Sequence, residues 1–361
     1  MAGEKTPEKR AIRLIRSLMP DPDPSDRPVR IIHVCGTHEQ TITKHGIRTL
    51  LPDNLEVLSG PGCPVCVTPA EDIDRVIALA ESGITVLTYG DMLRVPGSRA
   101  SLADVRAEGA DVRTVYSVND AVRIAEQGVG EVEVVFFGIG FETTAPSNAA
   151  VLMNDPPPNF SILCSHRLIP PAMDALIDDR LKIDGFIAPG HVATIIGTHP
   201  YDRFAEMGYP IVVTGFEPID VLFSIVMILK QIHDGRSVVE NEYARAVDES
   251  GNTKAQEMID QVFEVADANW RGIGQIRDSG LAIRSEFGDY DARLRYDIAI
   301  DPPVDLHPGC SCSMILRALK TPDECELFGG VCTPQTPYGP CMVSTEGTCH
   351  NWFRYGGRSE L

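Results

Sequence analysis

The feature that most restricts the fold is a series of short apolar runs that alternate with helical patterns along the chain. The runs are rich in Val, Ile, Leu and Phe and are bounded by Gly, Pro and Asp. Near-continuous apolar strands separated by helices are typical of parallel sheets covered on both faces. We therefore predict an α/β protein with two parallel-sheet domains facing a cleft and a small cysteine-rich C-terminal domain. The predicted strands are 29–34, 55–58, 84–89, 112–117, 131–138, 160–165, 184–189 and 209–215.

The chain divides into four predicted parts: 1–28 (helix and linker), 29–130 (first α/β domain), 131–270 (second α/β domain with a helical extension) and 271–361 (cysteine-rich domain). The linker at 20–28 is rich in Pro and Asp, and Pro interrupts both helices and sheets. Residues 254–270 carry apolar side chains at three- and four-residue spacing, which predicts a helix. The last part is poor in periodicity, and such segments usually need a metal or cross-links to be ordered.

The charge balance and the apolar segments exclude several classes of protein. The chain holds 32 Lys+Arg against 51 Asp+Glu, a formal net charge of −19, which argues against nucleic acid as a partner because phosphate binding draws on clustered cations. No stretch approaches the roughly 20 apolar residues of a membrane helix, and the N-terminus lacks the apolar core of a signal peptide. We expect a cytoplasmic protein, in which cysteines serve metal binding or catalysis more often than disulfides.

Cys35 directly follows a predicted strand, within the sequence Cys-Gly-Thr-His-Glu. The spacing of Thr37 and Gln40 predicts a capping box that starts a helix there. Open α/β sheets keep their sites at the carboxyl ends of strands, and a helix N-terminus and a nearby imidazole both favour the thiolate. With His38 and Glu39 so close, we interpret Cys35 as a nucleophile or metal ligand in preference to a small core residue.

Cys63 and Cys66 form a C-x-x-C pair after another predicted strand. Such a pair is either a redox dithiol or half of a tetrahedral zinc site. No second C-x-x-C exists in the chain, so the other half of a zinc-ribbon site is missing. We favour a dithiol, or an iron site shared with Cys35, over a purely structural role.

Three further strand ends each offer one ionisable side chain, Glu142, His191 and Glu217. The glycines before Glu142 resemble a dinucleotide-binding loop, but the third glycine of G-x-G-x-x-G is absent. A helix start capped by Thr explains that segment about equally well. Each residue alone would be unremarkable as a site, whereas the three together on one rim favour a functional cleft.

The last 52 residues hold six cysteines: Cys310, Cys312, Cys325, Cys332, Cys341 and Cys349. Their spacing matches neither a zinc ribbon nor the ferredoxin C-x-x-C-x-x-C run. Four thiolates around an iron-sulfur cluster plus one extra pair would account for all six. A zinc site plus two spare thiols would account for them equally well.

Several long motifs in one order give a more specific indication than any single one. They are CGTHE at 35–39, GPGCPVC at 60–66, GFETTAP at 140–146, APGHV at 188–192, GFEP at 215–218 and CTPQTPYGPCMVSTEGTC at 332–349. On these motifs the chain resembles the HypD family of NiFe hydrogenase maturation proteins, over nearly its whole length after the linker.

The resemblance implies a scaffold on which iron receives cyanide and carbon monoxide, the Fe(CN)2CO centre. It implies a HypC-type chaperone and a HypE-type cyanide donor as partners, with the hydrogenase large subunit as an indirect one. Cys35 would be the iron ligand, with Cys63 and Cys66 as the redox-active dithiol beside it. His38, Glu39, Glu142 and His191 would support the iron site from around its ligand or handle protons in the cleft.

The resemblance also implies a 4Fe-4S cluster bound by Cys310, Cys325, Cys332 and Cys349. The remaining pair, Cys312 and Cys341, would form a disulfide beside the cluster, an arrangement similar to ferredoxin-thioredoxin reductase. The alternative function is therefore an autonomous thiol-disulfide oxidoreductase of that type, with no iron at Cys35.

Overall fold

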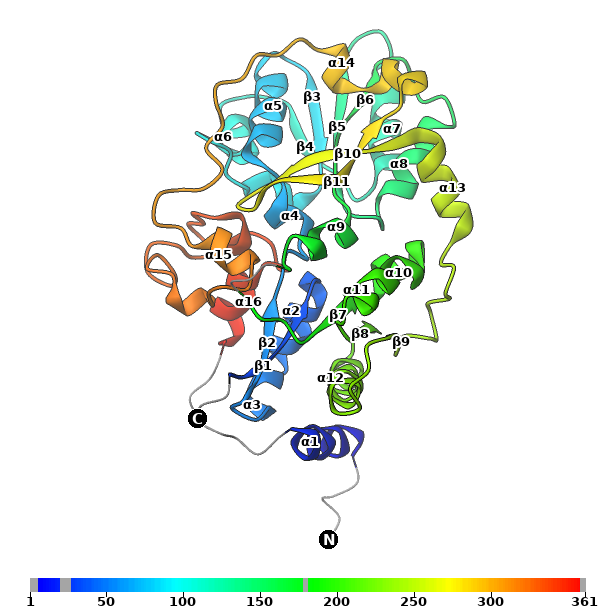
Figure 1. Ribbon diagram of the computed structural model, residues 1–361. Helices are drawn as coiled ribbons and strands as arrows, with labels where there is room; N and C mark the ends of the chain where they lie inside the picture. Colours follow the sequence, from blue (N-terminus) through cyan, green and yellow to red (C-terminus); the bar gives the residue numbers. More distant parts are fainter. Residues whose placement is uncertain (1–5, 20–26, 178–180, 358–361) are drawn as a thin grey trace.

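Two parallel sheets, one above the other, make up most of the molecule (Figure 1). The computed structural model describes residues 6–19, 27–177 and 181–357. The first sheet has the strand order β2-β1-β7-β8-β9 and the second has the order β4-β3-β5-β6, with every neighbouring pair parallel. Their strands are β1 (Val29–His33), β2 (Leu55–Ser59), β3 (Thr85–Thr88), β4 (Val112–Thr114), β5 (Val134–Gly140), β6 (Phe160–His166), β7 (Gly185–Pro189), β8 (Ile211–Thr214) and β9 (Val239–Asn241).

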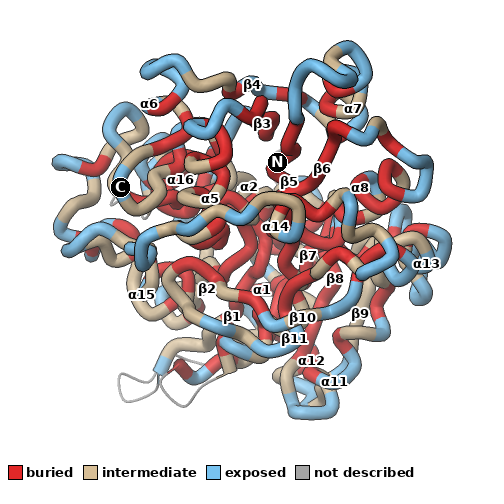
Figure 2. The backbone as a smooth tube through the Cα atoms, turned by 90° about the horizontal axis from the view of Figure 1, so that it is seen from above, coloured by how far each residue is buried: buried red, intermediate tan, exposed pale blue. Residues whose placement is uncertain are grey.

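All eight predicted strands are confirmed, and so is the α/β class. The central strands are buried on both faces: every residue of β5, β6 and β7 is buried. Figure 2 shows these strands in red inside the molecule and the connecting loops in pale blue outside. These strands are apolar on both faces because helices cover both faces of each sheet.

The helices cover the sheets and fill the space between them, where α4 and α9 lie (Figure 1). The N-terminal helix α1 was predicted, and its buried Ala11 and Ile15 pack on α12 at four-residue spacing. Most of the predicted linker, 20–26, lies outside the described residues. The helices up to residue 295 are α1 (Pro7–Leu18), α2 (Gly36–Lys44), α3 (Ile47–Leu50), α4 (Pro64–Val67), α5 (Ala70–Glu81), α6 (Leu102–Ala107), α7 (Val118–Gln127), α8 (Ala145–Leu152), α9 (Ile169–Asp174), α10 (Gly190–Ile196), α11 (Asp202–Glu206), α12 (Pro218–His233), α13 (Thr253–Val262) and α14 (Ala292–Arg295), with 3-10 turns η1 (Gly90–Arg94), η2 (His199–Tyr201) and η3 (Ser285–Tyr290).

The sheets do not follow the domain boundary expected near residue 130. Strands β3 and β5, which lie on either side of that boundary, pair directly in the second sheet. The first sheet takes β1 and β2 from the beginning of the chain and β7 to β9 from its middle. The chain thus leaves the first sheet after β2 and returns to it at β7. Apolar runs reveal where strands are but not which strand each one pairs with, so the expected ranges 29–130 and 131–270 do not coincide with the sheets.

The helix predicted over 254–270 is only half correct. Helix α13 ends at Val262, and the chain continues as β10 (Phe263–Trp270), which pairs antiparallel with β11 (Gly274–Ile283). This hairpin crosses the second sheet (Figure 1). The segment after Gly272 therefore begins with a strand. Pairing with a neighbouring segment has overridden the helical spacing of 263–270.

The C-terminal segment contains little regular structure, as predicted. It holds α15 (Cys312–Leu316), η4 (Pro322–Glu324), η5 (Pro340–Met342) and α16 (Thr348–Tyr355). One continuous apolar core joins both sheets to this segment, and the six C-terminal cysteines pack in it or against it. Among the described helices, none has the length and apolar character to cross a membrane.

Candidate functional site

Cys35 is buried at the carboxyl end of β1 and is the N-cap residue of α2. The predicted helix is confirmed, but the capping box is not, because the helix starts one residue after the cysteine and Thr37 donates instead to Glu346 Oε1 at 3.1 Å. Burial raises the pKa of the Cys35 thiol to about 12, against the opposing effect of the His38 and Thr37 N–H groups. The thiol therefore keeps its proton at neutral pH unless a cation or metal ion replaces that proton.

A glycine loop holds the C-x-x-C segment against Cys35. The Gly36 N–H donates to the Gly62 carbonyl at 2.9 Å. A Cβ atom on Gly62 would lie 2.0 Å from the Cys35 nitrogen, so only glycine allows this approach. Cys63 follows at once as the N-cap of α4. The turn after β1, which carries Cys35, and the turn after β2, which carries Cys63, are thus hydrogen-bonded to each other.

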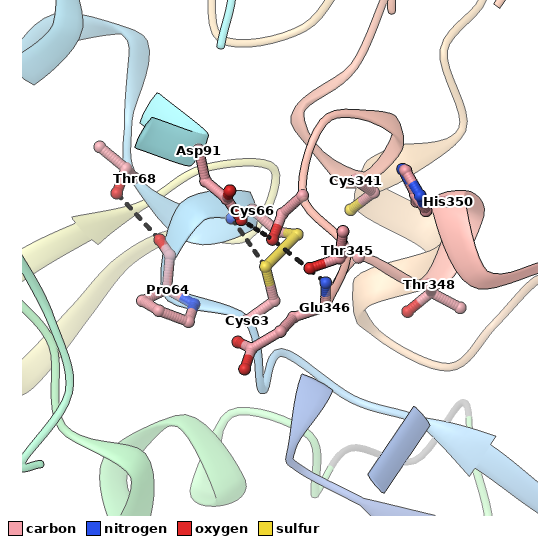
Figure 3. Close-up of a disulfide and its surroundings, with 12 residues drawn as sticks. Cys63, Pro64, Cys66, Thr68, Asp91, Cys341, Thr345, Glu346, Thr348 and His350 are labelled. Atoms are coloured by element: carbon pink, nitrogen blue, oxygen red, sulfur yellow. Dashed lines mark hydrogen bonds between the residues drawn. A yellow bond between two sulfur atoms is a disulfide. The ribbon is translucent and has the colours of Figure 1, made fainter. Parts of the chain in front are cut away.

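Cys63 and Cys66 are joined by a disulfide in this structure (Figure 3). The Cys66 N–H donates to Cys63 Sγ at 3.3 Å, as a helix N-cap does. Both sulfurs lie in the continuous core that reaches into the C-terminal segment. Figure 3 shows that the surroundings of the disulfide include Thr345 and Glu346 from that segment.

Glu346 is a site residue that the sequence analysis missed. It packs so closely on α2 that a Cβ on Gly36 would lie 2.5 Å from Glu346 Cβ. Its charge acts on the Cys35 thiol, and burial raises the pKa of the Glu346 carboxyl itself. Its only signal in the sequence was its place between Cys341 and Cys349 in a long motif.

His38 and His191 come together on the two sides of one ring. Phe216 stacks on His191 with 3.8 Å between ring centroids and on His38 with 4.9 Å. His38 is fully buried, and its Nε2 lies 2.9 Å from the Gly215 carbonyl, so Nε2 carries the proton and Nδ1 is a bare acceptor. Burial lowers the pKa of His38 to about 3. The pKa of His191 is also lowered, because its ring is partly shielded from water although the residue is exposed.

Of the two roles expected for Glu39, its surroundings fit a supporting role and not proton handling. It is fully buried, and its two oxygens accept from Arg48, from Thr43, from the ring of His33 and from the Trp352 indole. Burial alone would raise the pKa of Glu39, but Arg48 and His33 hold it below its usual range. The carboxylate therefore ties α2 to α16 as a fixed anion, with no lone pair left over for protons in transit.

Glu142 lies just after β5, where the second sheet faces the first. It is buried, its Oε1 accepts from the Ile169 N–H at 2.8 Å, and its Oε2 has no partner among the described residues. Burial raises the pKa of Glu142 to about 7. Glu217, expected on the same rim, is exposed and serves as the N-cap of α12 together with Asp220.

All six C-terminal cysteines line one small cavity. In the part of the chain that the structure describes, no three His, Cys, Asp or Glu side chains converge as ligands of a single metal ion. A cluster several atoms across needs its thiolates around a cavity instead of around a point. Six cysteines around one cavity fit a cysteine-bound iron-sulfur cluster.

Two of the six cysteines form a close pair. Cys312 Sγ and Cys341 Sγ lie 3.0 Å apart, and both are buried free thiols, so the disulfide expected between them is not formed in this structure. The contact with Cys341 lowers the pKa of Cys312, and the buried guanidinium of Arg271 acts in the same direction. Arg271 carried no signal in the sequence. The other four, Cys310, Cys325, Cys332 and Cys349, remain around the cavity.

Comparisons with known proteins identify the family of this chain. Residues 9–356 match the HypD model, described as the hydrogenase formation hypA family. The chain is 46% identical to hydrogenase maturation factor HypD2 of Bradyrhizobium diazoefficiens, covering 98% of this chain and 96% of the relative. It is 48% identical to a putative hydrogenase expression/formation protein of Methanocaldococcus jannaschii (91% and 92% covered) and 45% identical to HypD of Cupriavidus necator (89% and 88%). The chain therefore belongs to the HypD family of hydrogenase maturation factors.

Proposed function

We propose that this protein is the scaffold on which the Fe(CN)2CO centre of NiFe hydrogenases is assembled. Iron would be held at Cys35 together with a HypC-type chaperone, and a HypE-type donor would deliver cyanide before the centre passes to the hydrogenase large subunit. The observation that carries the proposal is the position of Cys35, an N-cap at a strand end fastened to the disulfide loop. Soft thiolates suit iron that carries strong-field diatomic ligands.

The buried thiol suits a site that is occupied only by metal. Its pKa of about 12 keeps Cys35 protonated and unreactive when no iron is bound. Coordination replaces the proton, so loading of iron releases one proton per thiol.

We further propose that four cysteines, Cys310, Cys325, Cys332 and Cys349, hold a 4Fe-4S cluster. When bound, the cluster would supply single electrons. Cys312 and Cys341, as two thiols, give two electrons and two protons to the Cys63–Cys66 disulfide, which becomes two thiols while Cys312 and Cys341 become a disulfide. Two electrons from an external one-electron donor and two protons from water then restore the Cys312 and Cys341 thiols. The dithiol then stands beside Cys35 while cyanide is added to the iron.

Infrared spectroscopy of the protein purified anaerobically with its partners tests the scaffold function. We expect nitrile and metal-carbonyl bands in the wild type and in Cys164→Ala, and none in Cys35→Ala. Cys164 is the matched control because it is a buried cysteine of β6, hydrogen-bonded to the Leu281 carbonyl at 3.2 Å. Bands that survive in Cys35→Ala would contradict the proposal.

The close thiol pair and the disulfide also favour a second function, the autonomous thiol-disulfide oxidoreductase. This function predicts full dithiol turnover with a protein substrate in Cys35→Ala. A cluster-containing wild type with no diatomic bands in any preparation would favour it over the scaffold.

The electron path has a test of its own in Cys312→Ala. We expect reduction of the Cys63–Cys66 disulfide by a one-electron donor to stop in this variant, while the iron-sulfur absorbance remains. Unchanged disulfide reduction and unchanged maturation would show that electrons take another route.

A further inference from the structure

Tyr201 is a second buried polar group in the interface between the two sheets, and nothing in the proposed function uses it. It ends the 3-10 turn η2 (His199–Tyr201), which follows α10 beyond the first sheet. The side chain is fully buried, and its hydroxyl has no hydrogen-bond partner in the described ranges. Leaving a buried hydroxyl unpaired costs free energy, and native proteins keep few such groups outside functional sites.

The phenol of Tyr201 lies within electrostatic range of both Glu142 and Cys35. Each of these three residues comes from a different part of the chain: Cys35 from the end of β1, Tyr201 from the turn after α10 and Glu142 from the end of β5. The hydroxyl and Glu142 Oε2 are both unpartnered, so they do not bond to each other. Tyr201 therefore offers an unused hydroxyl that lies near both the buried thiol and a second unused group.

The chemistry of these two groups is that of hydrogen-bond donors. Tyrosine remains protonated at neutral pH, and burial together with the Glu142 and Cys35 charges raises its pKa further. Burial also keeps the Glu142 carboxyl protonated up to about pH 7. A ligand that fits them must offer an acceptor atom with a lone pair in an otherwise apolar setting.

We propose that the Tyr201 hydroxyl and the Glu142 carboxyl donate hydrogen bonds to the nitrogen of cyanide on the iron held at Cys35. This inference rests on the proposed scaffold function and adds a contact that distinguishes cyanide from carbon monoxide. A metal-bound cyanide ends in a basic nitrogen, whereas the oxygen of bound carbon monoxide is a poor acceptor. A site with two donors thereby selects the position of the cyanide ligand.

The test compares infrared spectra of the anaerobic complex for the wild type, Tyr201→Phe and Glu142→Gln, each in H2O and in D2O. Tyr209→Phe is the matched control, because it removes the same atom from a ring packed on Phe186. We expect a nitrile band to shift in both site variants, the D2O shift of that band to be smaller in Tyr201→Phe than in the wild type because one of its two donors is gone, and the control to match the wild type.

The melting temperature gives a second readout. An unpartnered hydroxyl contributes no hydrogen bond to the fold, so Tyr201→Phe should keep or raise the Tm of the protein without iron. Unchanged nitrile bands and an unchanged D2O effect in both variants would overturn the inference. If Tyr201→Phe fails to fold, the Glu142→Gln spectrum decides alone. A wild type without any nitrile band would instead contradict the proposed function.

Discussion

The molecule holds sulfur in two regions that owe their order to different forces. In the first, Cys35 and Cys63 are N-cap residues at the ends of β1 and β2, so backbone hydrogen bonds of a parallel sheet position them. In the second, the six C-terminal cysteines lie on loops and short turns around a cavity. The difference teaches that backbone hydrogen bonds of a sheet position a thiol directly, whereas loop-rich segments usually need a metal or cross-links to be ordered.

The two regions are nevertheless joined by a short, specific connection. Thr37 of α2 donates to Glu346, and the Trp352 indole of α16 donates to Glu39 at 2.9 Å. Both contacts bring the C-terminal segment onto the helix that Cys35 caps. A change in the order of the C-terminal loops therefore alters the surroundings of Cys35, the proposed iron ligand.

The largest effect should come from removing what the C-terminal cysteines bind. Under anaerobic chelation, or in Cys325→Ala, we expect amide hydrogen exchange in 310–347 to accelerate on the order of 100-fold, because the loops lose their cross-link. Exchange in β5 and β6 should change little. Cys164→Ala, a buried cysteine inside β6, is the control that should leave both regions protected. Equal loss of protection in the sheets and in the loops would break the comparison.

The next largest effect should come from Glu39, which connects the two regions. Glu39→Gln leaves the buried Arg48 guanidinium without its counter-charge, and breaking one side of a buried ion pair costs about 3–5 kcal/mol. Chemical denaturation of the holoprotein measures this free energy of unfolding.

The matched control for this variant is Asp301→Asn at the exposed pair Arg99–Asp301, where the loss should stay below about 1 kcal/mol. A cost at Glu39 no larger than at Asp301 would show that the connection contributes little to the fold.

The sequence and the structure agree where a site follows directly from a strand. The apolar run 29–34 predicted β1, and with it the placement of Cys35 at the carboxyl end of a strand. Strand pairing was not predictable from the same runs, because parallel strands look alike along the chain. The partners of Glu39 were not predictable for a related reason: Arg48 and Trp352, which neutralise and bind it, are its neighbours only after folding.

Tyr201 and Glu346 were missed because the contacts that make them noteworthy are long-range. Tyr201 sits in a 3-10 turn with no motif around it, and only burial beside Glu142 and Cys35 distinguishes it. The loops around the six cysteines have no periodicity to read, so their shared cavity appears only in three dimensions.

A pH titration sharpens the comparison within the cleft. The folded pKa of Glu142 is about 7, above its ordinary value near 4.5, so the folded protein binds the proton more tightly than the unfolded chain. The resulting stability is complete below about pH 4.5 and is lost as the pH rises through 7.

We therefore expect the wild type to lose about 3 kcal/mol of unfolding free energy relative to Glu142→Gln as the pH rises from about 4.5 to 8. Thermal or chemical denaturation across this range measures it. Parallel pH profiles of the two proteins would mean that Glu142 is not held protonated.

The smallest effect on the fold should come from Cys35 itself. Ser is at least as good an N-cap as Cys, so Cys35→Ser should change the free energy of unfolding by no more than about 1 kcal/mol. Denaturation of the protein without iron measures this value, and the nitrile bands of the same variant should be absent. A large destabilisation would mean that the thiol stabilises the strand end through packing. A small destabilisation would show that the sheet positions residue 35 without help from its thiol. The C-terminal loops, by contrast, are expected to become ordered only around the group that their cysteines bind.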